Sequence, residues 1–337
     1  EHLYHVPPLS LPRASRRSLS ASEIANYEAV HLFVERARAV KPGFELTDEN
    51  ADVIADICQR LDGLPLAIEL AAARIRLFLP QALQQRLDNR FKVLSGGARD
   101  LPERQQTLRD AIDWSFDLLE DHEKMLFEVV SVFSGATFDA LEAVADRIEL
   151  LQERGVDVTE GLVSLVDKSL IRMSDDGLAE TRLRMLESIR EYATDRLIAN
   201  PELQSAACEA HAAYFANFAQ QQWKRMTGYE REPAIDEMTA DVDNLKIAWQ
   251  YWVREGNLEQ LQNMVNGLWL LFDTKGWYQD TVRLTHDLLN ILSATPSTHE
   301  HVQQEIMLQA SLAKALMAIK GFTSEVEEAY TRALKLS

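Results

Sequence analysis

One stretch of the sequence joins two helices so closely that it limits how the residues around it can fold. It reads Leu-Asp-Gly-Leu-Pro-Leu-Ala-Ile-Glu-Leu-Ala-Ala-Ala-Arg and occupies residues 61–74. Gly63 follows an amphipathic helical pattern, and a glycine in the left-handed conformation ends a helix without a steric penalty. Pro65 suits the first turn of the next helix, where its missing N–H breaks no hydrogen bond. The apolar residues that follow predict a second helix that is buried on most of its sides.

The remaining composition is that of a helical protein with more than one domain. The 337 residues exceed what one compact core usually holds. Only 13 glycines and 10 prolines interrupt them, and Ala, Leu, Glu, Gln and Arg are plentiful, which favours helices. We therefore expect a mainly α fold.

Changes of pattern divide this fold into four segments. In order, we expect an extended strand and linker, a small helical bundle, a winged-helix domain with a β-hairpin, and a tetratricopeptide-like solenoid, over residues 1–20, 21–100, 101–198 and 199–337.

Local signals mark several boundaries inside these segments. Thr47 is a good helix N-cap, with acidic residues in the turn that follows. Ser95-Gly96-Gly97 predicts a hinge. Two short runs, 169–173 and 181–185, flank an Asp-Asp-Gly turn and predict the hairpin. Glycines at 256, 276 and 321 end helices of the predicted solenoid.

Three stretches together resemble a known family. Thr47–Asn50, residues 61–74 and the run Arg-Gln-Gln-Thr-Leu-Arg-Asp-Ala-Ile-Asp-Trp-Ser at 104–115 resemble the region behind the nucleotide-binding core of STAND-class (NB-ARC or AP-ATPase) signalling ATPases. The resemblance is collinear to about Leu197 and is closest to bacterial regulators with tetratricopeptide-type repeats. It implies that residues 1–20 leave a nucleotide-binding domain. No phosphate-binding loop occurs in the sequence, so we expect a fragment of a longer protein.

The resemblance also implies a role for the turn. In the intact protein Gly63, Leu64, Pro65 and Leu66 would face the adenine of ATP or ADP, and the proline ring would offer a rigid apolar surface. The fragment alone would bind no cofactor. Without the resemblance, the same turn is simply a connection between two helices.

A second motif departs from the family. Met185-Leu186-Glu187 aligns with a Met-His-Asp motif whose histidine meets a phosphate of ADP. A leucine cannot donate that hydrogen bond. Glu187 remains a weaker candidate for nucleotide contact, and the alternative is that it is an ordinary acid in the first turn of a helix.

Charge argues against direct nucleic-acid binding. The net charge is −18, and residues 104–198 carry 21 acidic side chains against 11 basic ones. Arg172, Arg182 and Arg184 lie on the predicted wing and could touch phosphates. A duplex-binding surface nevertheless needs a net positive patch to release counterions. We expect a packing or switching role for the winged helix.

Aromatic residues gather in the predicted solenoid. They fall at helical spacings, so a solenoid core explains them, while a concave ligand groove is the alternative reading. These residues are Trp249, Tyr251, Trp252, Trp269, Phe272, Trp277 and Tyr278.

No residue pattern in the sequence indicates a disulfide, a metal site or a catalytic group. Cys58 and Cys208 lie far apart in helical segments, which argues against disulfides and for the cytoplasm. His299 and His301 lack further metal ligands nearby, and no nucleophile has a neighbouring base. We expect no catalytic residue, no metal site and no membrane segment, and therefore not an enzyme by itself.

These expectations combine into one function. The chain would be the regulatory and sensor part of a STAND-class ATPase that controls transcription. An effector on the repeats would bias nucleotide-dependent switching and self-assembly. Its partners would be its own missing nucleotide-binding domain and a protein or small-molecule inducer. Two alternatives stay open: a winged-helix DNA-binding protein, and a repeat scaffold for protein–protein interaction without a nucleotide.

Overall fold

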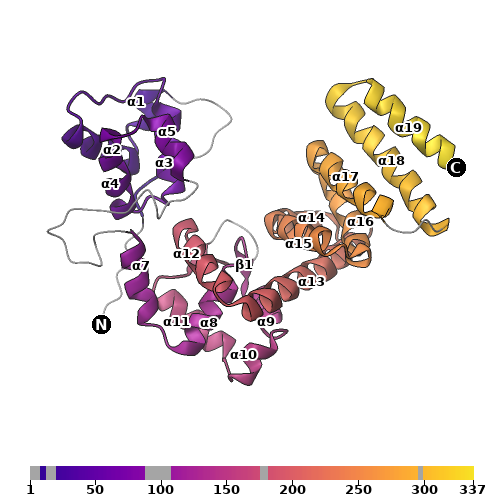
Figure 1. The fold of residues 1–337 in the computed structure, drawn as a ribbon, viewed down its shortest axis with the longest axis horizontal. Coiled ribbons are helices and arrows are strands. Elements are labelled where there is room, and N and C mark those ends of the chain that lie inside the picture. The colour runs from indigo at the N-terminus through magenta and orange to yellow at the C-terminus, as the bar shows by residue number, and fades with distance from the viewer. Residues whose placement is uncertain (1–7, 13–19, 88–107, 175–180, 295–298) are drawn as a thin grey trace. The chain divides into compact units, whose positions relative to one another are not determined.

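A computed structural model describes residues 8–12, 20–87, 108–174, 181–294 and 299–337 (Figure 1). The described chain is mainly helical with a small β-sheet, which confirms the predicted fold class. It divides into two compact units. The first comprises Glu1–Ser131, Thr159–Met173 and Met185–Ala199, and the second comprises Val132–Val158, Ser174–Arg184 and Asn200–Ser337.

The first unit opens with a small helical bundle. Its elements are α1 (Ala21–Ile24), α2 (Glu28–Val40), α3 (Ala51–Arg60), α4 (Pro65–Ala73), the 3-10 turn η1 (Arg74–Arg76) and α5 (Pro80–Arg86). Helix α2 packs against α3 and α4, and α5 packs against α3. Phe33, Ile54 and Ile68 are fully buried between them. Helix α4 is buried on most sides, as its apolar sequence predicts.

One helix start differs from the prediction. Helix α3 begins at Ala51, and its N-cap residue is Asn50 rather than Thr47. The Thr47 N–H donates to the Asn50 side chain at 2.9 Å, and the Thr47 carbonyl accepts from the backbone of Asn50 and Ala51. The predicted cap was wrong because residues 47–50 close a separate turn before the helix begins.

The rest of the first unit is built on α7 (Leu108–Asp117), α8 (Asp121–Val130), α11 (Val158–Asp167) and α12 (Glu187–Ile198). Phe116 packs against Phe127 and Tyr192, with ring centroids 5.6 and 5.7 Å apart. The Tyr192 hydroxyl donates to Asp113 on α7 at 2.5 Å. These contacts fix α12 against α7 and α8. The predicted hinge at 95–97 lies outside the described residues.

The two predicted hairpin strands are present as neighbours in a sheet, and a third strand joins them. Its strands are β1 (Ala136–Thr137), β2 (Arg172–Ser174) and β3 (Arg182–Arg184), in the order β1-β3-β2. Strand β1 pairs antiparallel with β3, with Ala136 opposite Leu183. The sequence did not indicate β1, because two residues are too few to show an alternating pattern.

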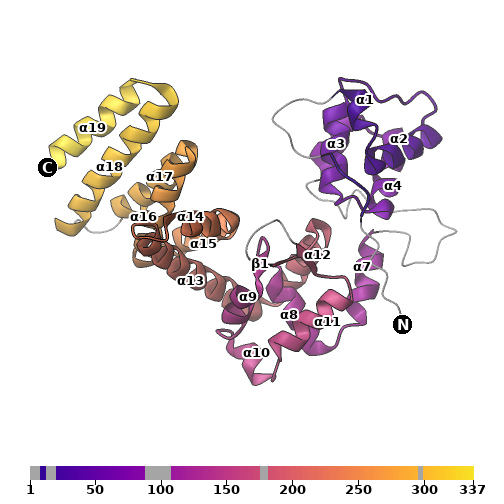
Figure 2. The ribbon, with the colours of Figure 1, turned by 180° about the vertical axis from the view of Figure 1, so that it is seen from behind.

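The second unit holds the two remaining short helices and the long helices of the C-terminal half. They are α9 (Phe138–Ala145), α10 (Glu149–Glu153), α13 (Pro201–Met226), α14 (Arg231–Ala240), α15 (Val242–Glu255), α16 (Leu258–Lys275), α17 (Tyr278–Ala294), α18 (His299–Lys320) and α19 (Ser324–Leu336). Helix α13 packs against α9 and against α14 to α16, and each of α16 to α18 packs against the next helix. Both views show α18 and α19 side by side (Figures 1 and 2).

Left-handed glycines separate these helices as predicted. Gly256, Gly276 and Gly321 have φ values of 64°, 72° and 72° and follow α15, α16 and α18. Among the described helices, none combines the length and the apolar character that crossing a bilayer requires.

Candidate functional site

The turn between α3 and α4 has the geometry that the sequence predicts. Asp62 and Gly63 are both left-handed, with φ values of 55° and 66°. The Gly63 N–H donates to the Cys58 carbonyl at 3.3 Å and so closes the end of α3. Pro65 is the first residue of α4. We call residues Asp62–Leu66 the proline turn.

The linker ahead of the bundle lies against this turn. The Leu9 N–H donates to the Gly63 carbonyl at 3.0 Å. A Cβ on Gly63 would lie 2.5 Å from the Leu9 carbonyl oxygen, which is closer than side chains tolerate. Position 63 therefore needs glycine for its left-handed backbone and for the close approach of the linker.

Pro65 is exposed and borders an open cavity of about 490 Å³. Leu9 of the linker lines the same cavity, as do Glu28, His31, Glu35 and Glu69. Glu69 is paired with Arg36 at 3.0 Å, and the proline ring offers an apolar surface to an uncharged ring. Leu64 is half-buried, and the Leu66 side chain lies outside the described part.

The proline turn also meets the start of α12. One Asp62 carboxylate oxygen accepts from the backbone N–H of Ser188 at 3.3 Å and lies 3.4 Å from its hydroxyl. The N-cap residue of α12, Leu186, has no side chain able to do this. Asp62 thus caps a helix that lies 126 residues further along the chain and places a negative charge at its positive end.

Removal of this cap will loosen the start of α12. We expect Asp62→Ala to speed hydrogen exchange at the Ser188 amide about fivefold, because losing an N-cap costs about 1 kcal/mol. Asp62→Asn should have a smaller effect, since asparagine keeps an acceptor and tolerates the left-handed backbone. Asp117→Ala, at an exposed position on α7, is the control. Equal exchange in Asp62→Ala and the control would show that Asp62 does not cap α12.

The Met185-Leu186-Glu187 motif lies beside the proline turn, although the contact is made by Ser188 and not by the predicted residue, Glu187. Glu187 is the first residue of α12, and its carboxylate accepts two hydrogen bonds from Arg190, at 2.7 and 3.1 Å. The first unit therefore joins the two motifs through Asp62 and Ser188. Asp62 was not among the site residues predicted from the sequence. Its place directly before the helix-ending Gly63 was a usable signal, because Asp tolerates a left-handed backbone.

Of the three arginines on the predicted wing, Arg182 is buried in an ion pair. Arg182 is only 3% exposed, and its guanidinium donates to both carboxylate oxygens of Asp241, at 2.6 and 3.1 Å. The expectation that Arg182 could touch DNA phosphates was wrong, because this ion pair buries it. Arg172 is half-buried and Arg184 exposed.

Arg182 belongs to a buried polar cluster in the second unit. We call this cluster the polar junction; it consists of Arg182, Asp241, Asn244, His211 and the Gly135 carbonyl. That carbonyl accepts from Arg182 at 3.0 Å and from the Asn244 amide at 2.7 Å. Asn244 also donates to Asp241 at 2.8 Å. The junction ties strand β3 and the loop before β1 to helices α13 and α15.

His211 completes the junction from α13. Its Nε2 lies 3.4 Å from the Asn244 oxygen, and the rings of Phe133 and Phe215 pack on it at 4.8 and 4.7 Å. Burial lowers the pKa of His211 to about 4, more than the Asn244 hydrogen bond raises it. The imidazole is therefore neutral near pH 7.

The aromatic residues of the repeats divide between core and surface. Trp249, Trp252 and Phe272 are buried, which confirms the core reading for them. Trp269 and Tyr278 line a cavity. Trp249 also borders a second cavity, of about 230 Å³, so the alternative of a ligand groove stays open at both places.

Comparison with known proteins gives relatives from mycobacteria. "Putative HTH-type transcriptional regulator Rv0890c" from Mycobacterium tuberculosis (strain ATCC 25618 / H37Rv) is 37% identical over 243 residues, which are 72% of this chain and 27% of the relative. "Putative HTH-type transcriptional regulator Mb0914c" from Mycobacterium bovis has the same values. "Uncharacterized protein Rv0894" from Mycobacterium tuberculosis is 34% identical over 198 residues, 58% of this chain and 46% of the relative.

The chain is thus homologous to transcriptional regulators described as HTH-type, and it spans about a quarter of their length. No family model matches the chain, and no solved structure matches it significantly.

Proposed function

We propose that the chain is the switch and sensor part of a nucleotide-regulated transcriptional regulator of the STAND class that acts in the cytoplasm. A preceding domain would hold ATP or ADP, with the proline turn against the adenine. An effector on the repeats would bias the equilibrium between a closed state and an open, self-assembling state.

The observation that carries the proposal is the placement of Pro65. Its ring is exposed at a cavity, beside the linker that would lead from a preceding domain. Exposure alone does not distinguish Pro65, since Pro201 is also exposed at the start of a helix; the cavity and the adjacent linker do. The homology to transcriptional regulators supports the regulatory role.

Nucleotide binding by the protein that includes its upstream sequence tests this role. We expect Pro65→Ala to weaken ADP binding about tenfold, or about 1.4 kcal/mol, through lost apolar contact. Pro201→Ala is the matched control, because Pro201 is also an exposed first residue of a helix, α13. Equal ADP affinity in both variants, measured by calorimetry, would refute the role of the turn. Absence of ADP binding to the unaltered protein would refute the STAND assignment and favour a repeat scaffold.

DNA binding by the winged helix is the second candidate, favoured by the HTH-type description of the relatives. The burial of Arg182 and the acidic segment around it count against DNA binding. A gel shift with the 337-residue chain at moderate salt separates the two candidates. A shift that weakens steeply with added salt would support the DNA reader.

A further inference from the structure

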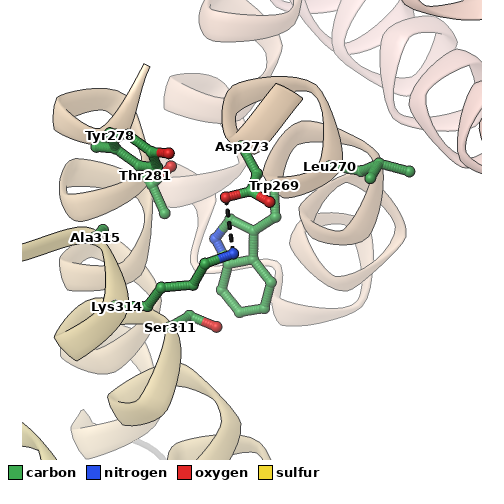
Figure 3. Close-up of a pocket in the computed structure, with 8 residues that line it drawn as sticks. All are labelled: Trp269, Leu270, Asp273, Tyr278, Thr281, Ser311, Lys314 and Ala315. Carbon is green, nitrogen blue, oxygen red and sulfur yellow. Dashed lines mark hydrogen bonds and ion pairs between the residues drawn. The ribbon is translucent and has the colours of Figure 1, made fainter. Parts of the chain in front are cut away.

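A cavity among the repeat helices has the features of a built ligand site. It has a volume of about 260 Å³ and lies between α16, α17 and α18 (Figure 3). This volume is slightly below the range of about 300–1,000 Å³ found for drug-sized ligands, so the cavity suits a small molecule with one ring. Its lining residues are Trp269, Leu270, Asp273, Tyr278, Thr281, Ser311, Lys314 and Ala315.

The indole of Trp269 brings an unused donor to this cavity. Its Nε1 is buried and has no hydrogen-bond partner within the described part of the chain. By contrast, the Nε1 of buried Trp249 donates to Asp287 at 3.0 Å and that of Trp252 donates to the Ala212 carbonyl at 3.1 Å. A buried donor without an acceptor is costly, so native structures rarely keep one. In Figure 3 the indole nitrogen faces the side where Lys314 and Asp273 meet. An acceptor on a bound molecule would satisfy it.

Two opposite charges stand beside the indole. The Lys314 ammonium and the Asp273 carboxylate are 2.8 Å apart, and their side chains are 62% and 48% exposed. The attraction between the two charges of such an exposed ion pair is weak. A ligand could therefore insert between them. An anion alone would leave Asp273 unpaired, and a cation alone would leave Lys314 unpaired.

A molecule that carries both charges leaves neither group unpaired. Its carboxylate would accept from Lys314 and from the Trp269 indole, and its ammonium would donate to Asp273. A flat apolar group would pack on the indole face. We propose that this cavity binds a free aromatic α-amino acid, or a zwitterion of the same shape, as the effector of the repeats. Its regulatory meaning rests on the proposed function, but the binding itself does not.

Indole NMR of the 337-residue chain tests the binding directly. With tryptophan labelled at the indole nitrogen, the Trp269 resonance is identified by its loss in Trp269→Phe. We expect L-phenylalanine to shift this resonance and to leave that of Trp249 in place. Two single-charge analogues, 3-phenylpropionate and phenethylamine, should bind at least tenfold more weakly. N-acetyl-L-phenylalaninamide, which mimics a residue within a peptide, should not bind.

Variants at the two charges complete the test. Lys314→Met and Asp273→Asn should each weaken L-phenylalanine binding at least tenfold without changing the unfolding temperature. Lys320→Met is the matched control, since Lys320 is also on α18 and pairs with an acid, Glu325, at 2.7 Å. No shift of Trp269, equal shifts with all four compounds, or unchanged affinity in both charge variants would overturn the proposal. No nucleotide is present in these measurements, so their outcome is independent of the ADP experiment.

Discussion

Asp241→Ala will lower the free energy of unfolding of the second unit by about 3–5 kcal/mol. The reason is the charge left behind: Arg182 is 3% exposed, and without Asp241 its guanidinium is a buried cation with no anionic partner. Asn244 loses an acceptor in the same variant, since its amide donates to Asp241 at 2.8 Å. Urea unfolding measures the change.

Two comparison variants show whether burial is the cause. Asp280→Ala removes the partner of Lys246 in a half-buried pair at 3.1 Å, and we expect a loss of about 1 kcal/mol or less. Adding Arg182→Met to Asp241→Ala should recover part of the lost stability, because the unpaired cation is then gone. A loss in Asp241→Ala no larger than in Asp280→Ala would mean that water reaches Arg182.

The parts of the fold that could be predicted are those with a local cause. Pro65 starts a helix and Gly256 ends one because each residue limits its own backbone angles, whatever surrounds it. The same holds for Thr137, whose side chain accepts from Ala140 and starts α9. The prediction that Thr47 caps α3 was wrong because residues 47–50 form a turn of their own. In that turn the Thr47 carbonyl accepts from the backbone N–H groups of Asn50 and Ala51.

The polar junction could not be predicted, because its cause is not local. Arg182 and Asp241 are 59 residues apart, and nothing near either residue in the sequence marks it as buried. Arg182 and Leu183 are both buried although they are neighbours on a strand, so the alternation that normally marks the inner face is absent. The contact of Asp62 with Ser188 could not be predicted for the same reason, since Ser188 lies in a different predicted segment.

The unfolding free energy of the second unit will fall as the pH drops from 7 to 5, and His211 will be the main cause. The pKa of His211 is lowered from its ordinary value of 6.5 to about 4 by burial. Between these values the unfolded chain takes up a proton that the folded chain does not, so stability is lost as the pH falls through 6.5 towards 4. The loss should reach about 2 kcal/mol at pH 5, at about 1.4 kcal/mol for each pKa unit.

His211→Gln isolates this effect, because glutamine can still donate to Asn244 but does not titrate. We expect the variant to lose most of the difference in unfolding free energy between pH 7 and pH 5. His286→Gln, at an exposed position on α17, should keep it. In the first unit, Glu123 titrates in a lower range: burial raises its pKa, but hydrogen bonds from Lys168, Ser164 and the backbone of Glu120 lower it to about 2. Stability linked to Glu123 is therefore lost only below about pH 4.5. If the unfolding free energy of His211→Gln fell between pH 7 and pH 5 as much as that of the unaltered chain, the titrating group would be a residue other than His211.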